Sequence, residues 1–214
     1  MDQTQHIPSL AHLRDFARAR KSGRATHVAA DREQVTAPRD DKFFAFAYEK
    51  FLTAVIEYVN NGCRGAALER VVENSSSRMH ASYAASAQGL ARLLDELRPV
   101  SARRRQRNLI AVDQDGEELV SLRVHLILEL ANGDQIGALI YFSERRLVPI
   151  EMSLVETATA LAVGQAAPNL IPAVLIARTG ELRIIDRGVA THADRVAFLH
   201  EESAAYRDEW ALGA

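Results

Sequence analysis

Residues 136–153 read IGALIYFSERRLVPIEMS, two apolar segments separated by a short charged turn. The first segment, 136–142, is rich in the branched and aromatic side chains that favour a buried strand. The second segment, 147–152, is apolar except for Glu151, and we interpret it as a further strand that ends on this carboxylate. A helix is predicted next, over residues 154–165. The stretch therefore predicts the centre of a β-sheet followed by a crossover helix.

The neighbouring segments extend this sheet in both directions. Before it, a strand is predicted at 109–112, and a long strand with alternating apolar residues at 119–130 leads into the hairpin signal Asn132-Gly133. After the crossover helix, strands are predicted at 171–177 and 181–185. A strand that follows a crossover helix usually returns parallel. The fold class is therefore α/β or α+β, with a mixed central sheet of about five strands and helices before and after it.

Domain organisation follows from where the apolar periodicity begins. Residues 1–42 form an N-terminal arm and linker, expected to be partly mobile, because residues 21–42 are polar and lack an apolar period. Residues 43–214 form a single α/β domain. Its helical part covers 43–99, its sheet core covers 108–186, and its C-terminal helix covers 191–210.

Composition limits the classes of function. The 214 residues carry a net charge of −2 and are 48% hydrophobic, which is ordinary for a soluble globular protein. Because no apolar run approaches the ~20 residues of a membrane span, we expect a cytoplasmic protein with no membrane partner. The single cysteine, Cys63, excludes an intrachain disulfide and a paired-cysteine zinc site. We expect no cofactor.

One dense basic run lies between the helical part and the sheet. Arg103, Arg104, Arg105 and Arg107 fall within five residues and could contact phosphates. No aromatic residue lies among them to stack on bases, which favours a solvated connector. Nucleic acid therefore remains one candidate partner, and a protein partner or a second copy of the chain is the other.

The order helix, strand hairpin, third strand ending in a carboxylate, helix and strand resembles the core of the restriction-endonuclease-like, or PD-(D/E)XK, nuclease superfamily. The resemblance covers about residues 78–186. It implies a metal-binding aspartate at Ala138, a metal-binding glutamate at Glu151 and a lysine at Ser153. Only Glu151 has the expected residue type. The resemblance also implies a glutamine facing the site from the crossover helix, where this chain has Gln165.

Two of the motif positions, Ser153 and Glu151, also have plain structural interpretations. Ser153 and Glu156 have the spacing of a capping box at a helix start. Glu151 is interpreted as a strand-end carboxylate in water or paired with an arginine such as Arg123. Glu129, on the polar face of the long strand, could supply a second carboxylate beside Glu151, although a solvated polar face is the simpler interpretation.

Three functional hypotheses follow. The leading one is a non-catalytic binding or assembly module built on a nuclease-like core, because two of the three expected catalytic positions are replaced. The second is a metal-dependent nuclease with relocated ligands, in which Glu151 and either Glu129 or a carboxylate of the 113–118 turn hold Mg²⁺. The third is a dimeric α+β interaction protein unrelated to nucleases.

Overall fold

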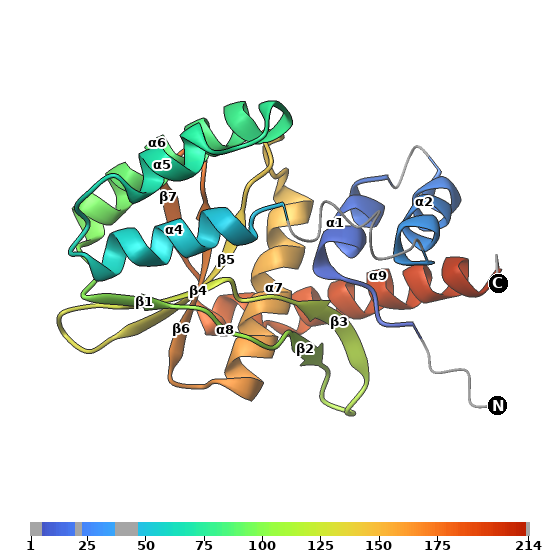
Figure 1. Cartoon of the computed structure of the whole chain (residues 1–214). Coiled ribbons are helices and arrows are strands. Elements are labelled where there is room, and N and C mark those ends of the chain that lie inside the picture. Colours follow the sequence, from blue (N-terminus) through green and yellow to red (C-terminus); the bar gives the residue numbers. More distant parts are fainter. Residues whose placement is uncertain (1–5, 20–22, 37–46, 213–214) are drawn as a thin grey trace.

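A computed structural model describes residues 6–19, 23–36 and 47–212, and its centre is a five-stranded mixed sheet (Figure 1). The strands lie in the order β1-β4-β5-β6-β7. Only β5 and β6 pair in parallel, and the other neighbours are antiparallel. The mixed α/β fold class expected from the sequence is thus confirmed. The strands are β1 (Ser101–Arg103), β4 (Leu126–Glu129), β5 (Gln135–Tyr141), β6 (Leu170–Ile176) and β7 (Glu181–Ile184).

Helix α7 (Pro149–Ala166) is the crossover between the two parallel strands. Its residues Leu154 and Ala158 are buried against the sheet. A crossover of this kind places the carboxyl ends of β5 and β6 side by side at one edge of the sheet. The segments that follow these ends, 142–148 and 177–180, therefore lie together.

One face of the sheet is covered by the helices α4 (Glu49–Asn60), α5 (Ala67–Glu73) and α6 (Ser77–Leu97). Their apolar sides form a buried cluster with Ala138 and Ile140 of β5. The apolar spacing of these helices predicts this packing, because residues three and four apart share one helix face.

The opposite face is covered by α7, with two further helices and a small hairpin beyond it. These are α1 (Leu10–Arg18), α9 (Ala193–Leu212) and the pair β2 (Leu109–Val112) and β3 (Glu118–Leu122). Leu139 of β5 faces this second buried cluster, so β5 divides its side chains between the two layers. The short helix α8 (Arg187–Ala190) precedes α9.

The predicted long strand over 119–130 is wrong, because the chain divides into β3 and β4, which belong to different sheets. The break lies at residues 123–125. There the His125 ring takes over part of the sheet ladder, since its Nδ1 accepts the Ile140 N–H at 2.9 Å. Strand periodicity continues through this break, so the sequence pattern does not reveal it.

The polar N-terminal segment also differs from the expected linker. Residues Arg24–Thr36 form helix α2, which packs on α9, and α1 packs on α7. Phe16 of α1 is fully buried and meets the ring of Tyr206 edge-on. Residues 1–5, 20–22 and 37–42 of the predicted arm and linker lie outside the described residues. The division at residue 42 stays a prediction.

The predicted strand over 147–152 is wrong as well. Helix α7 begins at Pro149, five residues before the expected start, and Glu151 lies in its first turn. Proline is favoured at the first helical position because its fixed φ suits a helix and its missing N–H has no partner to lose there. Glu151 accepts the Val148 N–H at 2.8 Å and so caps the helix start. Within the described residues, no helix is long and apolar enough to cross a membrane.

Candidate functional site

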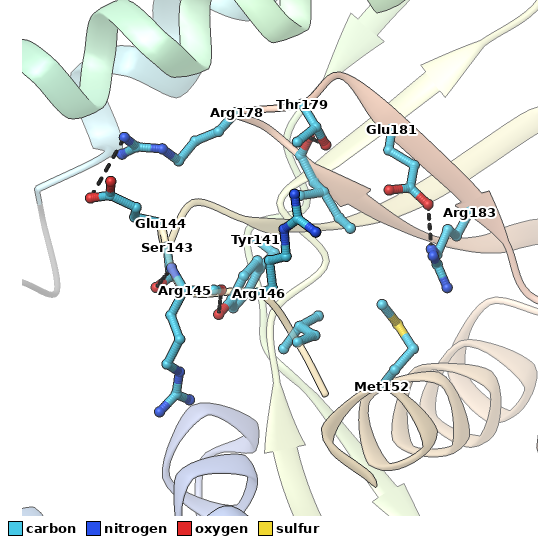
Figure 2. A pocket seen from close by; sticks show the side chains of 12 residues that line it. Tyr141, Ser143, Glu144, Arg145, Arg146, Met152, Arg178, Thr179, Glu181 and Arg183 are labelled. Carbon is cyan, nitrogen blue, oxygen red and sulfur yellow. Dashed lines mark hydrogen bonds and ion pairs between the residues drawn. The ribbon is translucent and has the colours of Figure 1, made fainter. Parts of the chain in front are cut away.

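An arginine-lined pocket lies where the parallel strands β5 and β6 end (Figure 2). Its volume is about 450 Å³. In open α/β sheets, ligands commonly bind outside the carboxyl ends of parallel strands. The charged lining consists of four arginines and two glutamates, so positive charge is in excess. These residues are Arg145, Arg146, Arg178, Arg183, Glu144 and Glu181.

Arg145 is committed to the structure around the pocket. Its guanidinium donates at 2.6 Å to Glu151 and also at 2.6 Å to Asp15 of α1. Arg18 of α1 donates to the second oxygen of Glu151 at 3.2 Å. Glu151 itself is fully buried, so both of its oxygens are satisfied by protein groups. This network ties α1 to the first turn of α7.

Arg146 and Arg178 are the arginines of the pocket that remain available to bind a ligand. Among the described residues, no hydrogen bond or ion pair joins Arg146 to a partner. Within the part of the chain that the structure describes, Arg178 has a single ion pair, with Glu144 at 3.8 Å, and the Glu144 side chain is 86% exposed. Ion pairs this exposed contribute about 0–1 kcal/mol. Figure 2 shows Arg146 reaching toward Thr179, with Arg183 on one side of it and the Arg178 guanidinium turned away toward Glu144.

The turn that carries Arg178 and Thr179 is fixed against helix α6. A Cβ atom on Gly89 of α6 would lie 2.2 Å from the Ala177 carbonyl oxygen, and one on Gly180 would lie 2.2 Å from the Gly89 carbonyl oxygen. Only two glycines allow the backbones to approach this closely. Arg92 also donates to the Thr179 carbonyl. This close contact with α6 therefore fixes the position of the turn that carries Arg178 and Thr179.

The remaining lining of the pocket is partly apolar. Leu147, Met152 and Ile176 are all partly exposed in it. Tyr141 is almost fully buried, and its hydroxyl donates to the Arg145 carbonyl at 2.5 Å. The hydroxyl thus fixes the loop that carries Arg145 and Arg146. The pocket combines available cations on its rim with an apolar surface beside them.

The residues expected from the nuclease resemblance do not come together here. Glu129 pairs with Gln135 at the start of β5, and Glu151 follows the end of that strand. Seven strand residues span about 20 Å, which is too far for a shared metal ion. Ala138 is fully buried in the apolar layer beneath α4 and α6. A carboxylate at that position would have no water or metal to meet.

Gln165 and Ser153 have structural partners. Gln165 bonds to the backbone N–H and C=O of Val112 and so attaches the β2–β3 hairpin to α7. It lies 14 residues beyond Glu151 in one helix, about 21 Å away. The expected capping box at Ser153 is wrong, because Ser153 lies inside α7. Its hydroxyl accepts from Arg195 of α9 at 3.1 Å.

The basic run 103–107 is divided between elements. Arg103 belongs to β1 and donates to Gln135 at 3.1 Å. Arg104 pairs with Glu49 of α4, which Arg123 also contacts at 2.6 Å. Burial opposes ionisation of Glu49, but these two arginines outweigh it and lower its pKa. Contact of these four arginines, Arg103, Arg104, Arg105 and Arg107, with nucleic acid stays a prediction.

A second polar cluster joins the β2–β3 turn to α9. Nε2 of His200 lies 3.0 Å from Glu117 and 3.8 Å from Asp113, and the three side chains could in principle surround a metal ion. Arg207, which is nearly buried, already pairs with Glu117, and Asp113 accepts two backbone N–H groups of its own turn. The cluster is thus a self-satisfied network that attaches the hairpin to α9. It lies at the Gln165 end of α7, far from Glu151.

Sequence reasoning missed the pocket arginines, although a signal was present. Glu144, Arg145 and Arg146 follow one predicted strand, and Arg178 and Thr179 follow another. A helix between two strands makes those strands parallel, so charged residues after both strands meet at one edge. The misplaced strand at 147–152 concealed this arrangement.

Comparison of the chain with models of known protein families finds none that matches, and comparison with curated proteins finds no significant similarity.

Proposed function

We propose that this protein is a non-catalytic binding module and that its binding site is the arginine-lined pocket at the ends of β5 and β6. The carrying observation is that Arg146 and Arg178 line a pocket of about 450 Å³, where Arg146 has no ion pair with another described residue and Arg178 has a long contact of 3.8 Å with the exposed Glu144. Guanidinium groups in such a position favour an anionic ligand.

The polar chemistry of the pocket supports binding more than catalysis. Its described lining holds no histidine, cysteine, aspartate or lysine, which are common nucleophiles and proton-transfer groups. Its two carboxylates, Glu144 and Glu181, are exposed and lie beside arginines. The hydroxyls of Ser143 and Thr179 contact backbone groups, the Arg145 N–H and the Ile176 carbonyl, and among the described residues neither is hydrogen-bonded to these carboxylates.

Binding of an anion can be tested by thermal unfolding in inorganic phosphate and in chloride at matched ionic strength. A ligand that binds only the folded chain raises its stability by RT ln(1 + [L]/Kd). We expect phosphate to raise the melting temperature of the unmodified chain and to have no such effect on the double variant Arg146→Met/Arg178→Met. Equal melting temperatures in the two salts would refute anion binding at this site.

The nuclease hypothesis remains a separate prediction, and the geometry supplies little support for it. Glu151 is enclosed by Arg18, Arg145 and the Val148 N–H, so a metal ion would have to displace two cations. Cleavage of DNA or RNA in Mg²⁺ or Mn²⁺ that is lost in Glu151→Gln would establish it. Assembly through a protein partner or a second copy is likewise a prediction, which measurement of the mass in solution would test.

A further inference from the structure

We infer, on the basis of the proposed function, that the ligand is an organic phosphate of nucleotide size. Its phosphate would lie between Arg146 and Arg178, and its flat or apolar remainder would lie against Leu147, Met152 and Ile176. A volume of about 450 Å³ is within the range of small-molecule sites, about 300–1,000 Å³.

The placement of the cations favours phosphate over carboxylate. Arg146 follows β5 and Arg178 follows β6, so the two side chains come from different segments of the pocket lining. Figure 2 shows the Arg178 guanidinium turned toward Glu144, and this exposed contact of 3.8 Å is one that Arg178 would leave to meet the phosphate. A carboxylate has two oxygens in one plane, which a single arginine fork can satisfy. A phosphate monoester has three terminal oxygens in a tetrahedral arrangement, and it can receive two forks from two directions. The Thr179 hydroxyl, whose contact with the Ile176 carbonyl is a long 3.4 Å, is placed to add a third donor.

The start of α7 does not supply the phosphate site. Helix N-termini attract anions, but here the Glu151 carboxylate already accepts the Val148 N–H. Arg145 is also occupied by Glu151 and Asp15. Recognition of the phosphate therefore depends on Arg146 and Arg178, and substituting either arginine alone can test it.

The apolar lining distinguishes an organic phosphate from inorganic phosphate. Leu147, Met152 and Ile176 keep part of their surface in contact with water in the pocket. Covering this surface contributes about 25 cal/mol per Å² of apolar area. Methionine is also an adaptable partner for aromatic rings. A phosphate attached to a heterocycle would use both parts of the pocket.

Isothermal titration of the full chain at low ionic strength can test the ligand class. The probes are AMP, GMP, CMP and UMP. Adenosine and inorganic phosphate, the two parts of AMP, are tested separately. We expect at least one nucleotide to bind tenfold or more tightly than either adenosine or inorganic phosphate. If inorganic phosphate binds as tightly as every nucleotide, the ligand class is wrong and anion binding survives. If no anion binds, the proposed function fails too.

Variants locate the binding. Arg146→Met and Arg178→Met should each weaken nucleotide binding tenfold or more, whereas Arg70→Met should change it less than threefold, because Arg70 lies on α5, outside the pocket lining, and pairs with Glu57 at 2.6 Å. Met152→Ala should weaken nucleotide binding and leave binding of inorganic phosphate unchanged. Thermal melts would confirm that each variant is folded. Unchanged nucleotide affinity in Arg146→Met would overturn the inference, as would a 5′-phosphorylated oligonucleotide that binds tenfold more tightly than any mononucleotide.

Discussion

Glu151 shows how the environment of a residue decides its role. The same carboxylate that suggests a metal ligand in the sequence is buried in the structure and satisfied by Arg18, Arg145 and the Val148 N–H. Removing one partner of a buried ion pair leaves the others without compensation. A residue of this kind acts on stability, by fastening α1 and the 142–148 loop to α7.

Glu151→Gln should therefore destabilise the fold. Hydrogen bonds to charged groups contribute about 1.5–3 kcal/mol, and the amide keeps the capping contact while losing the charge, so we expect a loss of about 1–3 kcal/mol in urea denaturation. Glu144→Gln in the same loop is the matched control, because its side chain is 86% exposed. It should change stability by less than about 0.5 kcal/mol. Equal stability of the two variants would contradict the role given to Glu151.

His125 makes a second prediction at the scale of one residue. Burial of the ring, with a smaller contribution from the Arg123 charge, lowers its pKa to about 4. The neutral ring accepts the Ile140 N–H, and protonation would remove that acceptor. The unfolded chain, where histidine has a pKa of about 6.5, binds this proton first as the pH falls. Stability is therefore complete above pH ~6.5 and is lost as the pH falls toward ~4.

The comparison with His125→Gln isolates this effect. Between pH ~4 and ~6.5, His125 should change the free energy of unfolding by at most about 1.4 kcal/mol per pH unit. This contribution should be absent in the variant, because glutamine does not titrate. Urea denaturation at pH 4.5 to 8 would measure it. Parallel pH profiles for the two proteins would show that His125 stays protonatable in the fold.

At the scale of elements, the approach of α6 to the β6–β7 turn determines where Arg178 and Thr179 lie. Gly89 has no side chain at the contact, and its neighbour there is backbone, which cannot rotate away. Overpacking in Gly89→Ala should lower the free energy of unfolding by roughly 1–3 kcal/mol. We expect this loss to exceed the ~1 kcal/mol by which alanine stabilises a helix relative to glycine. It should also weaken ligand binding, because the turn would shift.

Gly164→Ala is the matched control for that substitution. Gly164 is also a helical glycine, in α7, but a Cβ there would have no neighbour within 4 Å. We expect this variant to be more stable than the unmodified chain by up to about 1 kcal/mol. Urea denaturation should show that the free energy of unfolding falls in Gly89→Ala and rises in Gly164→Ala. A stabilising Gly89→Ala would contradict the close packing of the turn on α6.

The element boundaries show which parts of this fold the sequence encodes locally. Strands β5, β6 and β7 lie within one residue of their predicted ranges, because their apolar periodicity and flanking turns are strong. The start of α7 was mispredicted because the apolar run before Ser153 suits a strand as well as a buried helix. Pro149 and Glu151 carried the correct signal. The placement of Arg146 and Arg178 in one pocket depends on parallel pairing over a separation of more than thirty residues, which no local pattern specifies.

At the scale of the whole molecule, the N-terminal helices decide whether the chain has one core or a core with a loose arm. Leu13 and Phe16 of α1 are fully buried in the same cluster as Val163 of α7 and Tyr206 of α9. Asp15 and Arg18 of the same helix reach the Arg145 network beside the pocket. The packing thus indicates that α1 belongs to the folded unit and that its contacts with Arg145 and Glu151 hold the loop beside the pocket.

Phe16→Ala tests this organisation. If α1 is part of one cooperative unit, losing a fully buried phenylalanine should cost about 3–5 kcal/mol, and the whole chain should still unfold in a single transition. Leu212→Ala, whose side chain is 82% exposed at the end of α9, is the control and should have little effect. Denaturation followed both by far-ultraviolet circular dichroism and by fluorescence of Trp210 would report on the two levels of structure. A separate early transition, or a loss below about 1 kcal/mol, would show instead that the N-terminal segment is an arm that detaches without disturbing the sheet.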